Sequence, residues 1–229
     1  MSDMEGGGFP DDLEMPEGAR YTARYPMAMA YAAVKHAAQG RKDEFETPYI
    51  SHPVAVSMLV WQYAEPDGLH ASDVLEDLAI AALLHDVAED AGGPEALAEI
   101  QALFGDRVAE IVDHCSDATP AAGEAKAPWR ARKEAHVERM RRFADPASQS
   151  FDPGACLVIG CDKLHNLEQT AQDVGAQGEA AMASPRFNGG PEGTRWYYRT
   201  LRDVLAPALP GSVLARINEQ AALLGAPER

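Results

Sequence analysis

The sequence predicts an all-α fold, a compact single-domain helical bundle. From Tyr25 onward, nearly every segment between Gly/Pro clusters reads as a helix. Alternating apolar and polar runs, which would indicate strands, are absent from the sequence. The 229 residues, 46% of them hydrophobic, are enough to build one large core.

Residues 1–24 are expected to form an acidic, flexible tail ahead of a domain that spans residues 25–229. This tail is rich in Gly and Pro and carries few large apolar residues. It lacks the basic start and apolar stretch of a signal peptide, so we expect a cytoplasmic protein. No run of about 18 apolar residues occurs, so no transmembrane helix is expected either.

Capping residues delimit the first two predicted helices. Gly40 is a suitable C-cap for a helix over residues 26–39. After a polar loop, Ser51 is a suitable N-cap, and Pro53 is tolerated in the first turn of a helix. The second helix is therefore expected over residues 51–64.

The next predicted helix, residues 73–90, changes character along its length. Its first turns are apolar, and its end carries His85, Asp86, Glu89 and Asp90. Because burying an unpaired charge costs several kcal/mol, a bound metal ion is the obvious compensation. His85 and Asp86 point about 100° apart on a helix, so both reach an ion only beside the helix flank. Glu89 and Asp90 lie one turn further on, where they could handle a proton or position a water.

The remaining helices are separated by Gly/Pro loops. Gly105 divides two of them, and a loop rich in Gly, Pro and Ala follows residue 118. A basic amphipathic helix and a long helix with an apolar first half come next. These helices are expected over residues 94–104, 106–118, 129–144, 154–174, 195–209 and 211–225.

Charge and cysteine content exclude several classes of function. The formal net charge of −16 disfavours nucleic-acid binding, which needs a basic face. It also means that a phosphorylated substrate would need local positive charge from a metal or a small basic cluster. The three cysteines lack a CxxC spacing, so we expect reduced thiols and no zinc–thiolate site.

Two further residues complete a candidate metal site. His52 lies in the first turn of its helix, and Asp162 directly follows the apolar run of another. With His85 and Asp86 they make a His-His-Asp-Asp set drawn from three helices. This set suits a divalent transition metal such as Mn²⁺ or Fe²⁺ better than structural zinc, which prefers thiolates. Such an ion lowers the pKa of a bound water and polarises a phosphorus centre.

Four stretches carry a resemblance to a known family. In chain order, "TPYISHPVAV", "LLHDVAED", "FGDRVAEIVDHCSD" and "DKLHNLEQT" resemble blocks of the HD-domain metal-dependent phosphohydrolases. The chain is most similar to the hydrolase domain of RelA/SpoT-type proteins, over residues 27–173. The helices over residues 129–144 and 195–209 resemble those of the free-standing small alarmone hydrolases. Because the sequence ends at Arg229, no synthetase domain is expected to follow. The resemblance implies an HD-type bundle that removes the 3′-pyrophosphate of (p)ppGpp, releasing pyrophosphate and GDP or GTP.

The resemblance also implies roles for the metal and acidic residues. His52, His85, Asp86 and Asp162 would bind one divalent ion. Mn²⁺ is the usual ion of the family, with Fe²⁺, Co²⁺ or another divalent ion as alternatives. Glu89 and Asp90 match the acidic pair that acts on the attacking water and the leaving group, so we expect them to be catalytic.

Four further residues are implied in substrate binding. Arg41 and Lys42 match a basic pair beside the nucleotide, and Asn166 matches a residue that contacts it. Lys163 could add to the local positive charge that the acidic chain otherwise lacks. Gln169 departs from the family pattern near the base, which leaves guanine and adenine both open.

Several alternatives stay open at the level of sequence. The substrate could be an adenosine alarmone, (p)ppApp, or a nucleotide 2′- or 3′-phosphomonoester, and a nucleotide-sensing module is the non-enzyme alternative. The basic helix could meet phosphate through Arg130 or Lys133, or could be a solvated face. The aromatics of "RWYYRTL" favour core and interface packing over a base-stacking role. The expected partner is a small nucleotide, without nucleic acid or membrane, and homo-oligomerisation is left open.

Overall fold

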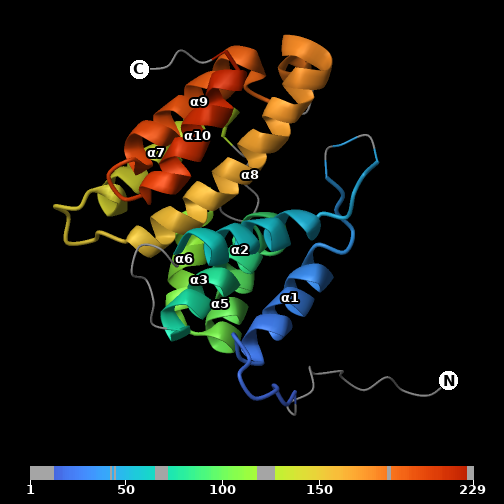
Figure 1. The fold of residues 1–229 in the computed structure, drawn as a ribbon, viewed down its shortest axis with the longest axis vertical. Helices are drawn as coiled ribbons and strands as arrows, with labels where there is room; N and C mark the ends of the chain where they lie inside the picture. Colours follow the sequence, from blue (N-terminus) through green and yellow to red (C-terminus); the bar gives the residue numbers. More distant parts are fainter. Residues whose placement is uncertain are drawn as a thin grey trace.

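The computed structural model describes residues 13–41, 43, 45–64, 72–117, 127–184 and 187–225 (Figure 1). This part of the chain is almost entirely helical, which confirms the all-α prediction. In the described residues, β pairing is limited to one isolated antiparallel bridge between Gly40 and Pro48. No helix in the described part combines the length and apolar character that a membrane span requires.

Two groups of helices are joined by one long helix. The first group contains α1 (Arg24–Lys35), α2 (Ser51–Ala64), α3 (Ser72–Leu84), α4 (Val87–Asp90), α5 (Gly93–Phe104) and α6 (Asp106–Cys115). The second contains α7 (Trp129–Ala144), the 3₁₀ helix η2 (Gly178–Ala183), α9 (Gly190–Leu205) and α10 (Gly211–Leu223), and the long helix that joins the groups is α8 (Pro153–Gln177). Helix α8 runs between the two groups in Figure 1 and packs against α2, α3, α6, α7, α9 and α10.

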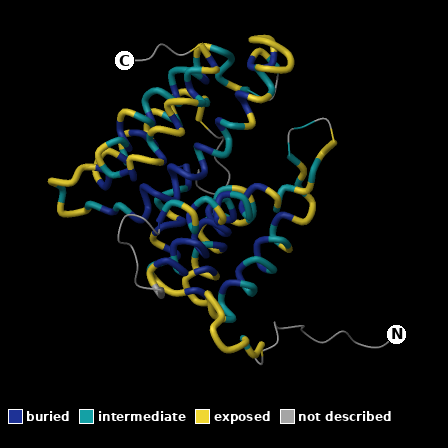
Figure 2. Tube along the Cα trace, viewed as in Figure 1, coloured by how far each residue is buried: buried dark blue, intermediate teal, exposed yellow. Residues whose placement is uncertain are grey.

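Helix α8 is the centre of the core because its first half is apolar on every side. Every residue from Gly154 to Asp162 is buried, as expected of a helix surrounded by others. Gly160 allows a close approach here, since a Cβ at this position would lie 2.6 Å from Cδ2 of Leu209. Figure 2 shows buried positions gathered where α8 meets the first group of helices. Asp162 therefore ends a buried run and lies in the middle of the molecule.

The first helix ends earlier than its sequence predicts. Helix α1 stops at Lys35, and Gly40 is not its C-cap. Instead, the backbone N–H of Tyr49 donates to the carbonyl of Gln39 at 3.0 Å, and the chain returns toward α2. A Cβ at Gly40 would lie 3.1 Å from the carbonyl oxygen of Glu46, so glycine serves this close pairing. The pairing across the loop replaces the last helical turn.

The predicted long helix over residues 73–90 is wrong, because the chain breaks into α3 and α4 at His85 and Asp86. At the other end of the chain, α8 extends to Gln177 and α9 begins at Gly190, beyond the expected bounds.

The expected tail is attached to the bundle at its end. The backbone N–H and the hydroxyl of Thr22 both donate to Oε1 of the buried Glu76, at 2.9 and 2.8 Å. The guanidinium of Arg24 donates to the carbonyl of Phe104 at 2.6 Å. Residues 1–12 lie outside the described residues, so the expectation of a flexible tail stays a prediction there.

One ion pair secures the start of α8. Asp152 is the N-cap, and its Oδ1 accepts from the backbone N–H of Ala155 at 2.9 Å. The guanidinium of Arg107 on α6 donates to both carboxylate oxygens at 2.7 Å. Burial alone would raise the pKa of Asp152, but Arg107 and the capping N–H hold this pKa below its ordinary value of 3.8.

Asp152→Ala is therefore expected to lower the free energy of unfolding by about 2–3 kcal/mol at neutral pH. A lowered carboxyl pKa stabilises the fold above pH 3.8 and loses this effect as the pH falls through the lower folded-state value. Urea unfolding at several pH values measures both effects. Glu110→Ala is the matched control, because Glu110 also contacts Arg107 but is 59% exposed. Equal losses in the two variants would contradict the capping role.

Candidate metal centre

The break between α3 and α4 brings two adjacent side chains to one point. His85 and Asp86 form the turn after Leu84. Nδ1 of His85 lies 2.7 Å from the carbonyl oxygen of Ala82, so this nitrogen carries the proton and donates. Nε2 of His85 then faces Oδ2 of Asp86 at 3.0 Å. A regular helix would direct the side chains of His85 and Asp86 about 100° apart. At this turn the two side chains reach the same point.

His52 from α2 and Asp162 from α8 complete the cluster. Nε2 of His52 lies 3.2 Å from Oδ1 of Asp162 and 3.5 Å from Oδ2 of Asp86. The nearest ligand atoms of His52, His85 and Asp162 all lie within 4.8 Å of one another, and all three residues are buried. Nε2 of His85 makes no well-directed hydrogen bond, although Oδ2 of Asp86 is 3.0 Å away. An orphaned buried nitrogen beside two carboxylates is what a divalent cation would satisfy.

The cluster is electrostatically unusual without a cation. Burial lowers the pKa of His52, which keeps the lone pair of Nε2 available. Burial also opposes a charge on His85, but Asp86 and Asp162 raise the pKa of His85 well above 6.5. Burial alone would raise the carboxyl pKa values of Asp86 and Asp162. His85 holds both pKa values below 3.8, and Lys163 also lowers that of Asp162. The site thus holds two negative charges that an ion and a lysine can share.

Side chains around the cluster orient its members. The hydroxyl of Tyr49 donates to Oδ2 of Asp86 at 2.6 Å. Nζ of Lys163 lies 2.6 Å from Oδ2 of Asp162, and Nδ2 of Asn166 donates to Oδ1 of Asp162 at 2.6 Å. Supports of this kind hold metal-binding side chains in one orientation.

His165 supports His52 from the side opposite Nε2. The Nδ1 atoms of the two rings lie 2.8 Å apart. Burial, with His52 beside it, lowers the pKa of His165 to about 4, so His165 is neutral at neutral pH and its Nδ1 can accept a hydrogen bond from Nδ1–H of His52. This contact orients the ring of His52.

Two adjoining pockets open over the cluster. The metal-side pocket has a volume of about 590 Å³, and the aromatic pocket about 310 Å³. They share Gly40, Tyr49, Lys163 and Asn166. The metal-side pocket is also lined by Gln39, Asp86, Glu89, Asp90, Lys133 and Asp162. The aromatic pocket is also lined by Arg41, Asp43, Gln169, Thr170, Asp173, Phe187, Tyr197 and Tyr198.

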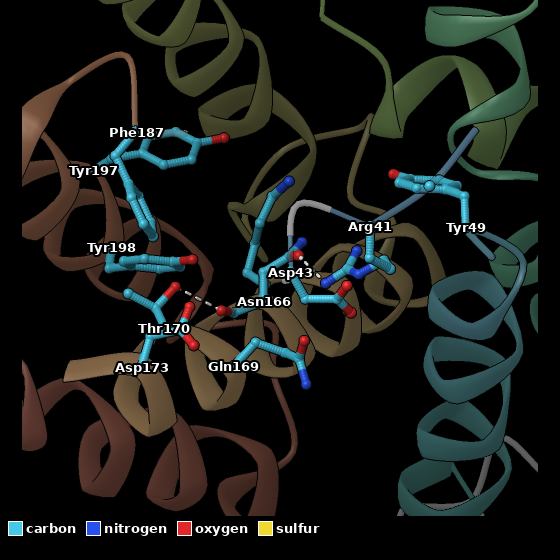
Figure 3. Close-up of a pocket in the computed structure, with 12 residues that line it drawn as sticks. Arg41, Asp43, Tyr49, Asn166, Gln169, Thr170, Asp173, Phe187, Tyr197 and Tyr198 are labelled. Carbon is cyan, nitrogen blue, oxygen red and sulfur yellow. Dashed lines mark hydrogen bonds between the residues drawn. The ribbon is translucent and has the colours of Figure 1, made fainter. Parts of the chain in front are cut away.

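The residues of the aromatic pocket come from distant parts of the chain (Figure 3). Tyr197 and Tyr198 from α9 lie on one side of it, and Arg41 and Tyr49 on the other. Residues of α8, among them Asn166, lie between these two sides. A flat aromatic molecule with polar edges, such as a nucleobase, suits these walls.

The expected catalytic pair lines the metal-side pocket. Oε2 of Glu89 accepts from the backbone N–H of Asp117 at 3.2 Å, and Oε1 lies 4.0 Å from NH1 of Arg132. Asp90 follows it at the end of α4. Both carboxylates therefore stand beside the cluster without belonging to it.

Three of the four expected substrate-binding residues meet in the pockets. Lys163 and Asn166 line both pockets, and Arg41 lines the aromatic pocket with NH2 3.5 Å from Oδ1 of Asn166. Lys42 lies outside the described residues.

Sequence reasoning missed several lining residues. Tyr197 is buried, as expected for a core aromatic, yet with Tyr198 it also forms a pocket wall. Tyr49 stands three residues before His52, and this proximity to a candidate ligand is a signal that could have found it. Of the two cations considered on α7, Lys133 lines the metal-side pocket, whereas Arg130 lies over the ring of Trp196.

Comparisons with known proteins agree with this geometry. Residues 28–184 match the family model described as HD domain. The chain is 37% identical over 140 residues to the guanosine-3′,5′-bis(diphosphate) 3′-pyrophosphohydrolase MESH1 of Mus musculus, covering 61% of this chain and 65% of that protein. It is 31% identical over 141 residues to the bifunctional (p)ppGpp synthase/hydrolase SpoT of Escherichia coli (strain K12), covering 62% of this chain and 17% of SpoT. The match to MESH1 thus spans just under two thirds of that relative.

A solved structure is also similar. It is described as a metazoan orthologue of SpoT that hydrolyses ppGpp and plays a role in starvation responses. The two structures align with a TM-score of 0.65 and 25% sequence identity, over 90% of this chain and 98% of that one.

Asp162→Ala is expected to abolish tight binding of a divalent ion, because Asp162 contributes a carboxylate at the centre of the cluster. Metal content after dialysis against Mn²⁺, measured by elemental analysis, tests this. Asp173→Ala on the same helix is the control and should retain the ion. Full metal content in Asp162→Ala would place the ion elsewhere.

Metal affinity should also rise with pH. A proton on His85 competes with the ion, and the two carboxylates raise the pKa of His85 above 6.5, although burial opposes this. Each displaced proton is worth up to about tenfold in affinity per pH unit. Calorimetric titration with Mn²⁺ between about pH 6 and about pH 8 measures the slope, and a flat profile would contradict this competition.

Proposed function

The chain belongs to the HD-domain family, and we propose that it is a metal-dependent hydrolase that removes the 3′-pyrophosphate of (p)ppGpp-like nucleotides. The observation that carries the proposal is the buried His/Asp cluster beneath a pocket lined by both Glu89 and Asp90. An adjoining aromatic pocket can take the base. The similarity to MESH1 and SpoT, which are named for this activity, supports the same substrate class. The cytoplasm is the proposed location.

One divalent ion, in our proposal Mn²⁺, would be held by His52, His85, Asp86 and Asp162. The unpaired Nε2 of His85 and the two adjacent carboxylates fit such an ion. Once bound, the ion supplies a Lewis acid that acidifies water and polarises a phosphoryl group. Tyr49, Lys163, Asn166 and His165 keep these four side chains in place through the contacts described above.

Glu89 and Asp90 are proposed to manage the protons of the reaction. The oxygen of a water molecule forms a bond to the phosphorus on O3′, and the bond between this phosphorus and O3′ breaks. The water gives up a proton to one carboxylate, and O3′ receives a proton as the nucleoside 5′-diphosphate or 5′-triphosphate leaves with its 3′-hydroxyl restored. Pyrophosphate carries away the oxygen of the water. The N–H of Asp117 holds the carboxylate of Glu89 in position for this role.

Positive charge near the pockets would bind the phosphates. Lys163 lines both pockets, and Arg41 lines the aromatic pocket, so both can neutralise negative charge that develops during the reaction. We assign Lys42 the same role from the sequence. Asn166, whose Nδ2 is used by Asp162, has its carbonyl oxygen directed toward Arg41 and would orient this cation beside the nucleotide.

Product analysis tests the activity. Mn²⁺-loaded protein is incubated separately with the guanosine and adenosine 3′-pyrophosphates, and the products are separated by anion-exchange chromatography. Equal amounts of pyrophosphate and the 5′-nucleotide are expected, and the faster substrate identifies the base. Turnover of neither, with release of phosphate from 3′-phosphomonoesters, would replace the proposal with a phosphomonoesterase. Tight nucleotide binding without any product would favour a sensing module.

Glu89→Gln is expected to lower kcat by about 10²- to 10⁴-fold, because the amide cannot accept the proton of the water. Metal content should not change, since Glu89 stands outside the cluster. Glu95→Gln, at an exposed position of α5, is the control and should retain full activity. If Glu89→Gln turns over at the wild-type rate, Glu89 is not the base.

A further inference from the structure

Helix α7 places a group of cations against one buried carboxylate at the end of α6. Oδ2 of Asp117 lies 2.7 Å from NH1 of Arg132 and 2.8 Å from Nζ of Lys133. Oδ1 of Asp117 lies 3.4 Å from Nδ1 of His136. The Asp117 side chain is 3% exposed, so the pairs are shielded from water. The same residue donates its backbone N–H to Glu89, which ties α7 to the proposed catalytic carboxylate.

The cations on α7 other than Lys133 do not line the metal-side pocket. Arg130 pairs with Glu134 and lies over the ring of Trp196. Arg139 donates to backbone carbonyls of Asp113 and Ser116. Nε of Arg132 donates to the carbonyl of Ala127 at 3.2 Å, and NH1 of Arg132 lies 4.0 Å from Oε1 of Glu89. Among the described cations of α7, Lys133 is the one that lines this pocket.

Lys133 is held from behind and from one side. Asp117, which does not line the pocket, takes one of the three N–H donors of its ammonium group. Nζ lies 5.3 Å from the centroid of the Tyr197 ring, which belongs to the aromatic pocket. The Lys133 side chain is only 16% exposed. The ammonium group of Lys133 is therefore fixed on the wall of the metal-side pocket, with two further N–H donors for a ligand.

The charge balance of this pocket calls for such a group. Asp86, Glu89, Asp90 and Asp162 line the pocket, and Lys163 pairs directly with Asp162 at 2.6 Å. A 3′-monophosphate needs only the ion and the groups beside it. A pyrophosphate carries a second phosphoryl group with further negative charge, which must find a cation away from this acidic floor.

We propose that Lys133, held in place by Asp117, binds the terminal phosphate of the 3′-pyrophosphate and so distinguishes pyrophosphorylated nucleotides from 3′-monophosphates. This assignment rests on the proposed function for the identity of the substrate. Asp117 acts through Lys133 and is a positioning residue. Lys133 touches the substrate and contributes to binding more than to the bond-breaking step.

The first experiment uses Mn²⁺-loaded protein and compares Lys133→Met with Lys133→Arg. Lys35→Met is the matched control, because Lys35 also pairs with a carboxylate, that of Glu99 at 2.6 Å, and also lies over a tyrosine ring, that of Tyr31 at 5.1 Å. The substrates are a nucleoside 5′-diphosphate carrying either a 3′-pyrophosphate or a 3′-monophosphate. Lys133→Met should raise KM for the pyrophosphate about tenfold or more, with kcat changed less than about twofold. Lys133→Arg should restore most of the affinity, and Lys35→Met should behave as wild type.

Binding gives a readout that does not depend on turnover. Calorimetry with inorganic pyrophosphate and with orthophosphate should show that Lys133→Met weakens only the binding of pyrophosphate. If the wild-type protein hydrolyses neither nucleotide, the proposed function fails, while this measurement still tests Lys133. Unchanged pyrophosphate affinity in Lys133→Met, or equal weakening for both anions, would overturn the proposal. Lys133→Gln, measured in parallel, keeps the test valid if the methionine variant loses its fold by circular dichroism.

A double-mutant cycle tests the role of Asp117. Asp117→Asn should raise KM for the pyrophosphate nucleotide in the wild-type background, and should add little in the Lys133→Met background. Fully additive effects would mean that Asp117 acts independently of Lys133, and the positioning role would be wrong.

Discussion

The burial of Asp162 in the middle of α8 is the constraint on which the rest of the structure depends. A carboxylate 5% exposed at the end of a buried apolar run would destabilise the fold by several kcal/mol without partners. His52, Lys163 and Asn166 all contact it. The chain break after Leu84 adds His85 and Asp86 to the same point. The helices pack around α8 in the arrangement that brings these partners together, so the site and the core are one structure.

The two pockets are suited to different tasks, the metal-side pocket to the chemical step and the aromatic pocket to recognition of the nucleotide. The metal-side pocket gathers acidic residues around the His/Asp cluster, which suits activation of water. The aromatic pocket is formed by α9, α8 and the loop before α2, elements that meet because α8 spans both groups of helices. Lys163 and Asn166 stand at the boundary. Although the chain has a formal net charge of −16, Arg41, Lys133 and Lys163 place positive charge on the pocket walls, where the proposed polyanionic substrate would need it.

Local patterns in the sequence were sufficient for most of the fold. The bounds of α2 and α7 follow from their flanking residues, and the described helices agree with the all-α prediction. The candidate cluster was also predictable, because His52, His85 and Asp162 each interrupt or border an apolar run. A titratable residue in such a place needs a partner wherever the helix packs. Confirmation of the HD-domain family came from the comparison of residues 28–184.

By itself, therefore, the sequence determined the helical segments. It also determined which titratable groups must be neutralised, since each of them is recognised from the apolar residues next to it in the chain. The tertiary structure decided that α1 ends at Lys35 and that α3 breaks before His85. It also decided that Lys133 and Tyr197 reach the pockets while Arg130 does not. These outcomes depend on contacts between residues far apart in the chain, such as Nε2 of His52 with Oδ1 of Asp162. No local period records such contacts, because packing selects them only after the helices have formed.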